Sequence, residues 1–196
     1  VGRSVAARAG AHLKKACVEL GGKDALIICE DADMERATSA ASFGSFMHQG
    51  QICMSVEKVL VQESVFDEFL KGFVARASKL KVGDPTKDKA NIIGPLINDK
   101  QANKSREQIA DAIAKGAEVV LGGNVTDRFV EPTILLGVTP DMKIYREENF
   151  GPVIPVIPFK TDEEAVAIAN DTEYGLSSGV ITRDEYRGLR IARQLE

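Results

Sequence analysis

Apolar and polar positions along the chain alternate between short continuous runs and helical repeats. Residues 25–29 are a continuous apolar run between polar residues, which is typical of a strand buried on both faces. Residues 34–48 follow with helical spacing, and Asp33 stands where an N-cap is expected. We expect further strands at 17–20, 59–61, 118–121, 129–136, 153–159 and 178–181, further helices at 2–13, 64–80, 98–115, 161–169 and the end of the chain, a loop at 82–98 and irregular structure at 137–152. Strands that alternate with helices of this length predict an α/β fold with a largely parallel sheet.

Composition and charge limit the classes of molecule that this protein is expected to bind and the compartment in which it is expected to occur. The 196 residues are 44% hydrophobic and 28% charged with a net charge of −4, as in ordinary globular proteins. The basic pair Lys14-Lys15 is too small for a nucleic-acid surface, and no apolar run is long enough to span a membrane. Three cysteines without a CxxC pair argue against a disulfide framework and favour a reducing compartment, so we expect a cytoplasmic protein.

Several kinds of site have no motif in this sequence. The two histidines, His12 and His48, lie far apart, and no cluster of His, Cys, Asp and Glu has metal-ligand spacing, so we expect no metal. The sequence also contains no Gly-x-Ser-x-Gly elbow, no Gly-x-Gly-x-x-Gly and no P-loop.

Cysteine chemistry remains as a candidate. Cys53 follows a predicted helix and the glycine at position 50, where a thiol can stand in a cleft, whereas Cys17 and Cys29 lie in apolar runs and are expected in the core. An attacking thiol needs a nearby base or a lowered pKa, because a free thiol has a pKa of about 8.5. Glu19 is the candidate base, since it ends a predicted strand in an apolar turn. A structural cysteine and a surface glutamate remain the alternatives that these residues alone favour, because the spacing does not show that Glu19 and Cys53 meet.

Four segments taken together are more specific than any one residue. They are Val-Glu-Leu-Gly-Gly-Lys at 18–23, Asp-Ala-Asp at 31–33, Gln-Gly-Gln-Ile-Cys at 49–53 and Glu-Glu-Asn-Phe-Gly-Pro-Val at 147–153. In this order and at these intervals they resemble the aldehyde dehydrogenase superfamily from the first residue to the last. The resemblance implies the three-layer α/β/α catalytic domain of that fold. It also implies that residues 1–17 end a cofactor-binding domain and that residues 18–196 form a catalytic (thiol) domain truncated at its C-terminus.

The resemblance assigns the reacting groups. Cys53 matches the nucleophile, which forms a thiohemiacetal with an aldehyde and then a thioester after hydride transfer to NAD or NADP. Glu19 matches the general base that activates water to hydrolyse the thioester. The family holds the oxyanion with the backbone N–H of the nucleophile and with an asparagine that has no counterpart in these residues. We therefore expect the fragment alone to be inactive in hydride transfer, and its full-length parent to be a homo-oligomer.

The resemblance also assigns cofactor contacts and a substrate class. Glu148 matches the glutamate that binds the nicotinamide ribose, and Phe150 the aromatic residue beside the nicotinamide. Gln101 and Lys104 match less distinctive cofactor contacts, for which a solvated helix face is the alternative. Residues 46–55 look most like the branch that oxidises aromatic aldehydes such as benzaldehyde, salicylaldehyde and vanillin, although the same apolar side chains also suit a helix core. A cofactor-independent thiol esterase and an inert structural fragment are the competing hypotheses.

Overall fold

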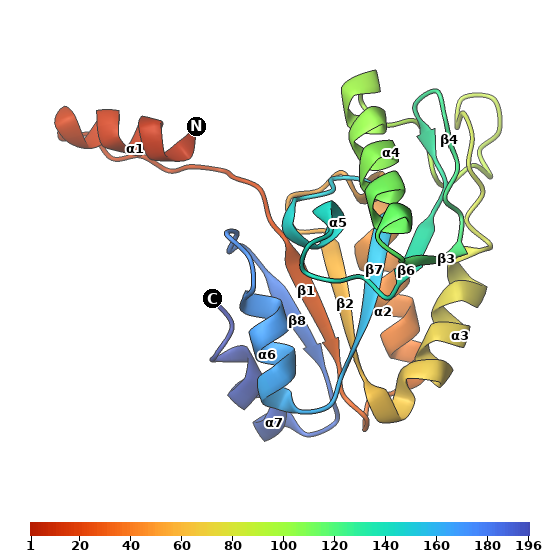
Figure 1. Cartoon of the computed structure of the whole chain (residues 1–196). Helices are drawn as coiled ribbons and strands as arrows, with labels where there is room; N and C mark the ends of the chain where they lie inside the picture. The colour runs from red at the N-terminus through yellow and green to blue at the C-terminus, as the bar shows by residue number, and fades with distance from the viewer.

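The computed structural model describes all residues, 1–196. In chain order the elements are α1 (Gly2–Ala11), β1 (Asp24–Ile28), α2 (Met34–Phe46), the 3₁₀ helix η1 (Met47–Gly50), β2 (Val56–Gln62), the 3₁₀ helix η2 (Glu63–Val65), α3 (Phe66–Ala77), α4 (Asp99–Ala114), β3 (Glu118–Leu121), β4 (Val125–Thr126), β5 (Phe129–Val130), β6 (Thr133–Leu136), α5 (Lys143–Arg146), β7 (Val153–Phe159), α6 (Asp162–Asn170), β8 (Ser178–Ile181) and α7 (Glu185–Ala192) (Figure 1).

A six-stranded sheet forms the centre of the molecule, with the strand order β3-β6-β7-β2-β1-β8. Neighbouring strands are parallel in every pair except β3 and β6, which run antiparallel. The predicted α/β fold with a mostly parallel sheet is therefore confirmed. Strands β1, β2, β7 and β8 run in the same direction, so the segments that precede them reach the same edge of the sheet.

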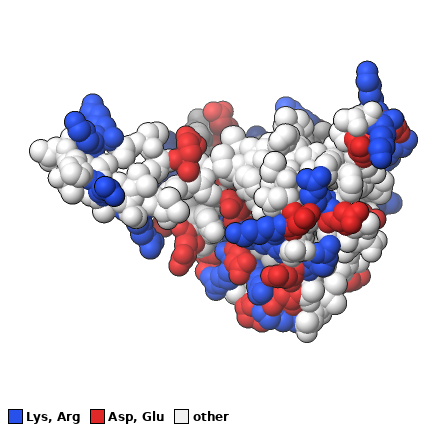
Figure 2. All heavy atoms as spheres, turned by 90° about the horizontal axis from the view of Figure 1, so that it is seen from above, with Lys and Arg blue, Asp and Glu red and all other residues white.

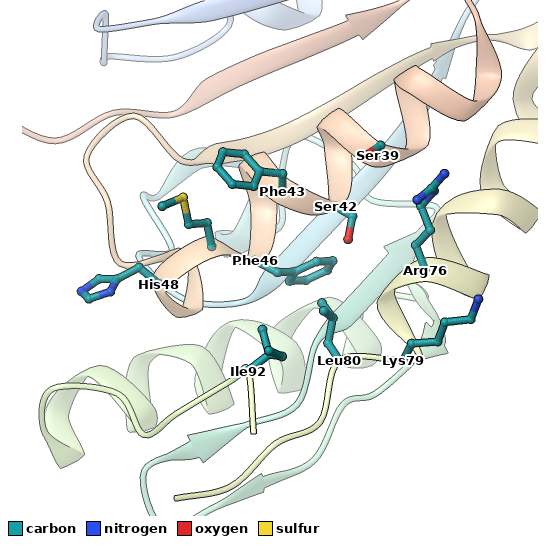
Figure 3. A pocket seen from close by; sticks show the side chains of 10 residues that line it. Ser39, Ser42, Phe43, Phe46, His48, Arg76, Lys79, Leu80 and Ile92 are labelled. Carbon is teal, nitrogen blue, oxygen red and sulfur yellow. The ribbon is translucent and has the colours of Figure 1, made fainter. Parts of the chain in front are cut away.

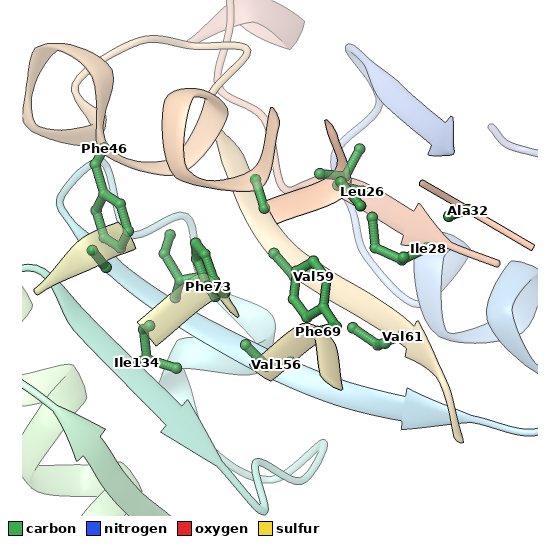
Figure 4. Close-up of a cluster of buried hydrophobic side chains, with 14 of the residues drawn as sticks. Leu26, Ile28, Ala32, Phe46, Val59, Val61, Phe69, Phe73, Ile134 and Val156 are labelled. Carbon is green, nitrogen blue, oxygen red and sulfur yellow. The ribbon is translucent and has the colours of Figure 1, made fainter. Parts of the chain in front are cut away.

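Helices cover both faces of the sheet, which gives the expected three layers. Side chains alternate along β1: Leu26 and Ile28 pack in the cluster that includes α2 and α3, whereas Ala25 and Ile27 pack with α6 and α7. Phenylalanines of α2 and α3 fill the first layer, where the rings of Phe46 and Phe73 stack with centroids 5.8 Å apart (Figure 4). Helices α4 and α5 close a third cluster over β6 and the start of β7. Because β1 is covered on both faces, it reads as a continuous apolar run.

Local signals fix several helix ends. The side chain of Asp33 accepts a hydrogen bond from Arg36 N at 3.1 Å and begins α2. Thr161 Oγ1 accepts from Glu164 N at 3.3 Å in the same way at α6. Gly116 follows α4 with φ +97°, a conformation that glycine adopts without a steric penalty. The predicted N-cap at Asp33 is confirmed.

The structure differs from the sequence-based prediction in two regions, residues 17–20 and residues 137–152. Residues 17–20 form no strand: they belong to an exposed segment that connects α1 to β1, with Val18 and Leu20 partly exposed. Cys17 is accordingly exposed rather than in the core, whereas Cys29 is buried as expected. Figure 1 shows α1 lying away from the sheet at the end of this segment. The region 137–152, expected to be irregular, contains the short helix α5.

Charged side chains of both signs are interspersed on the face of the molecule shown in Figure 2. None of the helices combines the length and the apolar character that crossing a membrane requires. The surface thus provides no concentrated field of one sign on that face.

Candidate active site

Segments distant in sequence meet at the edge of the sheet where its parallel strands begin. Residues 21–23 lead into β1, residues 51–55 lead into β2, and residues 148–152 lead into β7. Because these three strands are parallel neighbours, their preceding residues converge. The first turns of α4 approach the same edge, since the Gln101 side chain donates to Asn149 O at 2.6 Å.

Cys53 lies in a turn between η1 and β2. Its side chain is half-buried, and the turn is closed by a hydrogen bond from Ser55 N to Ile52 O at 3.0 Å. The backbone N–H of Cys53 has no acceptor within the chain. The backbone before Cys53 is left-handed over three consecutive residues: His48, Gln49 and Gly50 have φ values of +53°, +59° and +70°. A side chain at Gly50 would collide with the Gly151 carbonyl, so the thiol turn packs directly on the segment before β7.

Gly21 and Gly22 connect Cys53 to Glu148. Gly22 N donates to Glu148 Oε1 at 3.0 Å. A Cβ on Gly22 would lie 2.5 Å from Cys53 O, and a Cβ on Gly21 would lie 2.5 Å from Glu148 Oε1. At Gly22 the neighbouring atom is a backbone oxygen, so only glycine allows this approach, whereas at Gly21 it is the end of the Glu148 side chain. The structure thus brings Cys53 and Glu148 together through this pair.

Glu19 is placed differently from the sequence-based expectation. It is exposed in the segment without regular structure, and its carboxylate makes no hydrogen bond within the chain. The apolar turn at a strand end, from which its basicity was argued, is absent because residues 17–20 pair with no strand. Two residues, Leu20 and Gly21, separate Glu19 from Gly22, which approaches the carbonyl of Cys53. Its role as general base stays a prediction.

The remaining predicted residues lie on one side of this edge. Glu148 and Phe150 are half-buried and flank Asn149, whose carbonyl Gln101 holds. Gln101 and Lys104 line a polar hollow of about 700 Å³ on α4. Lys104 forms no hydrogen bond or ion pair within the chain. The structure therefore joins Gln101 to the 148–150 segment and leaves Lys104 at its margin.

A buried ion pair at this edge was missed by sequence reasoning. Lys23 Nζ lies 2.8 Å from Glu57 Oε2, with side chains 0% and 6% exposed. Glu57 also accepts from Asn149 N at 2.7 Å and from Phe150 N at 2.8 Å. Phe150 has φ +55°, a left-handed conformation that costs about 1–2 kcal/mol, whereas a hydrogen bond to a charged group contributes about 1.5–3 kcal/mol. The adjacent charges of Glu57 and Lys58 in an otherwise apolar strand were the available signal.

Burial shifts the pKa of two groups next to this pair. Burial raises the pKa of the Asp24 carboxyl, opposed by hydrogen bonds from Ser177. Burial, assisted by the neighbouring charge of Lys23, lowers the pKa of Lys58 to about 8. Lys58 Nζ lies 3.3 Å from the carbonyl oxygens of Ile168 and Asp171, at the end of α6. Lys58 therefore contacts the layer of α6 rather than the thiol turn.

A hollow of about 490 Å³ opens between α2, α3 and the start of η1 (Figure 3). Phe43, Phe46 and Met47 contribute apolar surface from the segment that leads to Cys53. Arg76 and Lys79 of α3 place two cations at the same hollow. Its size lies within the range of small-molecule sites, about 300–1,000 Å³.

Metal chemistry has no ligand set here, because no group of three or more His, Cys, Asp or Glu side chains could hold an ion. A dinucleotide fits the groups that are present. Glu148 Oε1 accepts from Gly22 N while Oε2 accepts no hydrogen bond within the chain, and the ammonium of Lys104 forms no ion pair there.

The fold and this edge define a cysteine-bearing domain of the three-layer α/β class. The family model described as "Aldehyde dehydrogenase family" matches residues 1–196. The chain belongs to the aldehyde dehydrogenase family.

Similar proteins include dehydrogenases of aromatic aldehydes. The chain is 47% identical to salicylaldehyde dehydrogenase of Pseudomonas putida, over 100% of this chain and 41% of that protein. It is also 47% identical to benzaldehyde dehydrogenase of Bacillus subtilis (strain 168), over 100% of this chain and 40% of that protein. The predicted resemblance to this branch is thus confirmed. The chain spans about 40% of the length of these curated relatives.

Solved structures of aldehyde dehydrogenases superpose closely on this chain. The salicylaldehyde dehydrogenase of Pseudomonas putida G7 complexed with salicylaldehyde superposes with a TM-score of 0.94 at 47% identity, over 100% of this chain and 40% of that one. The betaine aldehyde dehydrogenase of Staphylococcus aureus in complex with NAD⁺ superposes with a TM-score of 0.90 at 35% identity, over 99% of this chain and 41% of that one.

Proposed function

We propose that this chain supplies the thiol chemistry of an enzyme that oxidises an aldehyde to a carboxylic acid with NAD or NADP. The observation that carries the proposal is the approach of Cys53 to Glu148 through Gly22. Family membership supports the reaction class, and the NAD⁺ complex of a similar structure supports the cofactor. In this proposal residues 18–196 form the thiol domain, and residues 1–17, which project from it, end a cofactor-binding domain.

The thiol steps follow from the groups around Cys53. Its thiolate attacks the aldehyde carbon, a C–S bond forms, and the resulting oxyanion meets the free backbone N–H of Cys53. NAD or NADP, when bound, would supply the hydride acceptor for this carbon, and Cys53 would then hold the acyl group as a thioester. Water then attacks the thioester while Glu19 takes its proton, the C–S bond breaks, and the carboxylic acid leaves. The exposure of Glu19 gives its carboxylate access to that water.

Four residues would contact the cofactor. Glu148 would accept hydrogen bonds from the nicotinamide ribose through Oε2, because Oε1 is held by Gly22 N. Phe150 would pack beside the nicotinamide with its half-exposed ring. Gln101 would fix the segment between them, and Lys104 would offer its ammonium to a phosphate or a ribose.

The hollow beside α2 supports an aromatic aldehyde as substrate. Its apolar lining comes from Phe43, Phe46 and Met47, which precede Cys53 by six to ten positions. A flat apolar molecule would bury its faces against these side chains. Relatives that carry the names of aromatic aldehydes support the same substrate class.

The decisive experiment replaces Cys53 with serine in the gene product that carries this sequence. We expect NAD or NADP reduction with benzaldehyde to be lost in Cys53→Ser and retained in Cys17→Ser, whose thiol is exposed and lies outside the turn that carries Cys53. Iodoacetamide should label Cys53 before Cys17 and Cys29, and Cys29 slowest, because burial raises its pKa to about 11. Aldehyde oxidation that survives in Cys53→Ser would overturn the proposal. Hydrolysis of p-nitrophenyl acetate without any NAD(P)-dependent oxidation would favour the thiol esterase instead.

A further inference from the structure

The ion pair of Lys23 and Glu57 lies where the proposed nucleophile and cofactor segments meet. Glu57 is the second residue of β2 and follows Cys53 by four positions, and Lys23 directly follows Gly22. Both side chains are almost completely buried, at 0% and 6% exposure. A buried charge is retained only where hydrogen bonds and a counter-charge satisfy it, so the contacts of Glu57 show what it holds.

The Glu57 carboxylate binds two consecutive backbone N–H groups. Oε2 accepts from Asn149 N at 2.7 Å, and Oε1 accepts from Phe150 N at 2.8 Å. Phe150 has φ +55°, which a residue with a side chain adopts only where its surroundings enforce it. Two N–H groups that converge on one anion provide that enforcement, because an extended backbone would point them apart.

The rest of the segment is held from other directions. The Asn149 side chain donates to Gly151 O at 2.6 Å and to Val153 O at 3.1 Å, which fixes the entry to β7. On the other side, Glu148 Oε1 accepts from Gly22 N. Lys23 and Glu57 therefore close a ring of contacts that begins at Gly22, passes through Phe150 and Glu148, and returns to Gly22.

We propose that Glu57, with Lys23 as its counter-ion, is a positioning residue that fixes Glu148 and Phe150 relative to Cys53 and so sets cofactor affinity. The inference rests on the proposed cofactor role of Glu148 and Phe150. Glu57 touches neither the aldehyde nor the thiol, so it acts through the backbone of Asn149 and Phe150 alone. Its loss changes cofactor binding and leaves the reactivity of Cys53 unaltered.

The test compares Glu57→Gln with Glu63→Gln in the gene product that carries this sequence. Glutamine has a single acceptor oxygen, so Glu57→Gln leaves one of the two N–H groups facing an amide donor and leaves Lys23 without its counter-ion. Glu63 is exposed just after β2, its side chain makes no hydrogen bond or ion pair within the chain, and it serves as the matched loss of one charge. The double variant Lys23→Met/Glu57→Gln removes the unpaired cation and restores folding if the single variant is unstable.

Three readouts separate positioning from general stability. In Glu57→Gln and in the double variant, amide hydrogen exchange at Asn149 and Phe150 should accelerate by about tenfold or more, and the Kd for NAD should rise by a similar factor. Exchange at Val59 and Leu60 and the rate of Cys53 alkylation should stay unchanged, and Glu63→Gln should behave like the parent.

Unchanged exchange at Asn149 and Phe150 would overturn the positioning role, as would acceleration equal to that of Val59 and Leu60. Faster exchange with an unchanged Kd for NAD would overturn the link to cofactor affinity. The Cys53→Ser experiment tests the proposed function separately, because its outcome does not depend on Glu57.

Discussion

Replacing Gly22 with alanine should displace the nucleophile while leaving the fold intact. The new Cβ would lie 2.5 Å from Cys53 O and 2.8 Å from Asp24 Oδ1, whereas ordinary contacts begin at 3.4 Å. The backbone of Cys53 must therefore retreat by roughly 0.9 Å, because a carbonyl oxygen cannot rotate out of the way as a side chain can. Overpacking of this kind typically costs about 1–3 kcal/mol, which the protein can survive.

The chemical effect should exceed the effect on stability. A misplacement of about 1 Å lowers reaction rates by roughly 10²-fold, so acylation of Cys53 should fall about tenfold to a hundredfold in Gly22→Ala. Stoichiometric acylation by p-nitrophenyl acetate, followed by mass spectrometry of the Cys53 peptide, measures this rate without cofactor. Thermal unfolding measures the stability of the same samples.

Gly179→Ala is the matched control, because its Cβ would lie 2.9 Å from Leu26 Cδ1, in the sheet and outside the thiol turn. It should lower the melting temperature without slowing the acylation of Cys53. Acylation of Gly22→Ala at the parental rate, with the melting temperature lowered as in the control, would refute the claim that Gly22 sets the position of Cys53.

Two further predictions concern the layers on either side of the sheet. Burial lowers the pKa of Lys58 to about 8 from 10.5, so its ammonium destabilises the native state fully below that pH and progressively less up to the unfolded value. Relative to Lys58→Met, the free energy of unfolding of the parent, measured with urea, should thus rise on the order of 2–3 kcal/mol between about pH 7 and about pH 10. A difference between the two proteins that is independent of pH would contradict this. Phe46→Ala should cost about 3–5 kcal/mol, because the ring is buried against Phe73. Phe43→Ala, at a residue 66% exposed, should cost less than about 0.5 kcal/mol but weaken the binding of benzaldehyde, and unchanged benzaldehyde binding in this variant would count against the hollow as a substrate site.

The parts of the fold that the sequence predicts are those with a local cause. Residues 25–29 are apolar throughout because β1 is covered on both faces, and Asp33 begins α2 because its side chain reaches a backbone N–H three residues away. The predicted strand at residues 17–20 is wrong, because strand-forming side chains make a strand only beside a partner strand, and this segment has none. The same failure removed the apolar turn from which the basicity of Glu19 was argued.

The candidate site divides in the same way. Cys53 is visible in sequence through the motifs around it, which identify the family but not the contacts that hold the thiol turn. Glu57 is separated from Asn149 by 92 positions, and no periodicity along a chain reports such a partner. A charged residue inside an apolar strand is a departure from the pattern, and only the folded structure shows that Lys23 and two backbone N–H groups account for it.

The separation of Glu57 from its partners also orders events during synthesis of the chain. Strands β1 and β2 and the thiol of Cys53 leave the ribosome well before Asn149 and Phe150. At about 5–20 residues per second, a separation of 92 residues corresponds to a wait of roughly 5–20 s. During that time the carboxylate of Glu57 has water in place of its backbone donors, and the edge of β2 that will pair with β7 is open. The free edge of β2 and the site around the nucleophile therefore close together, when the segment before β7 arrives, and β8 completes the sheet afterwards.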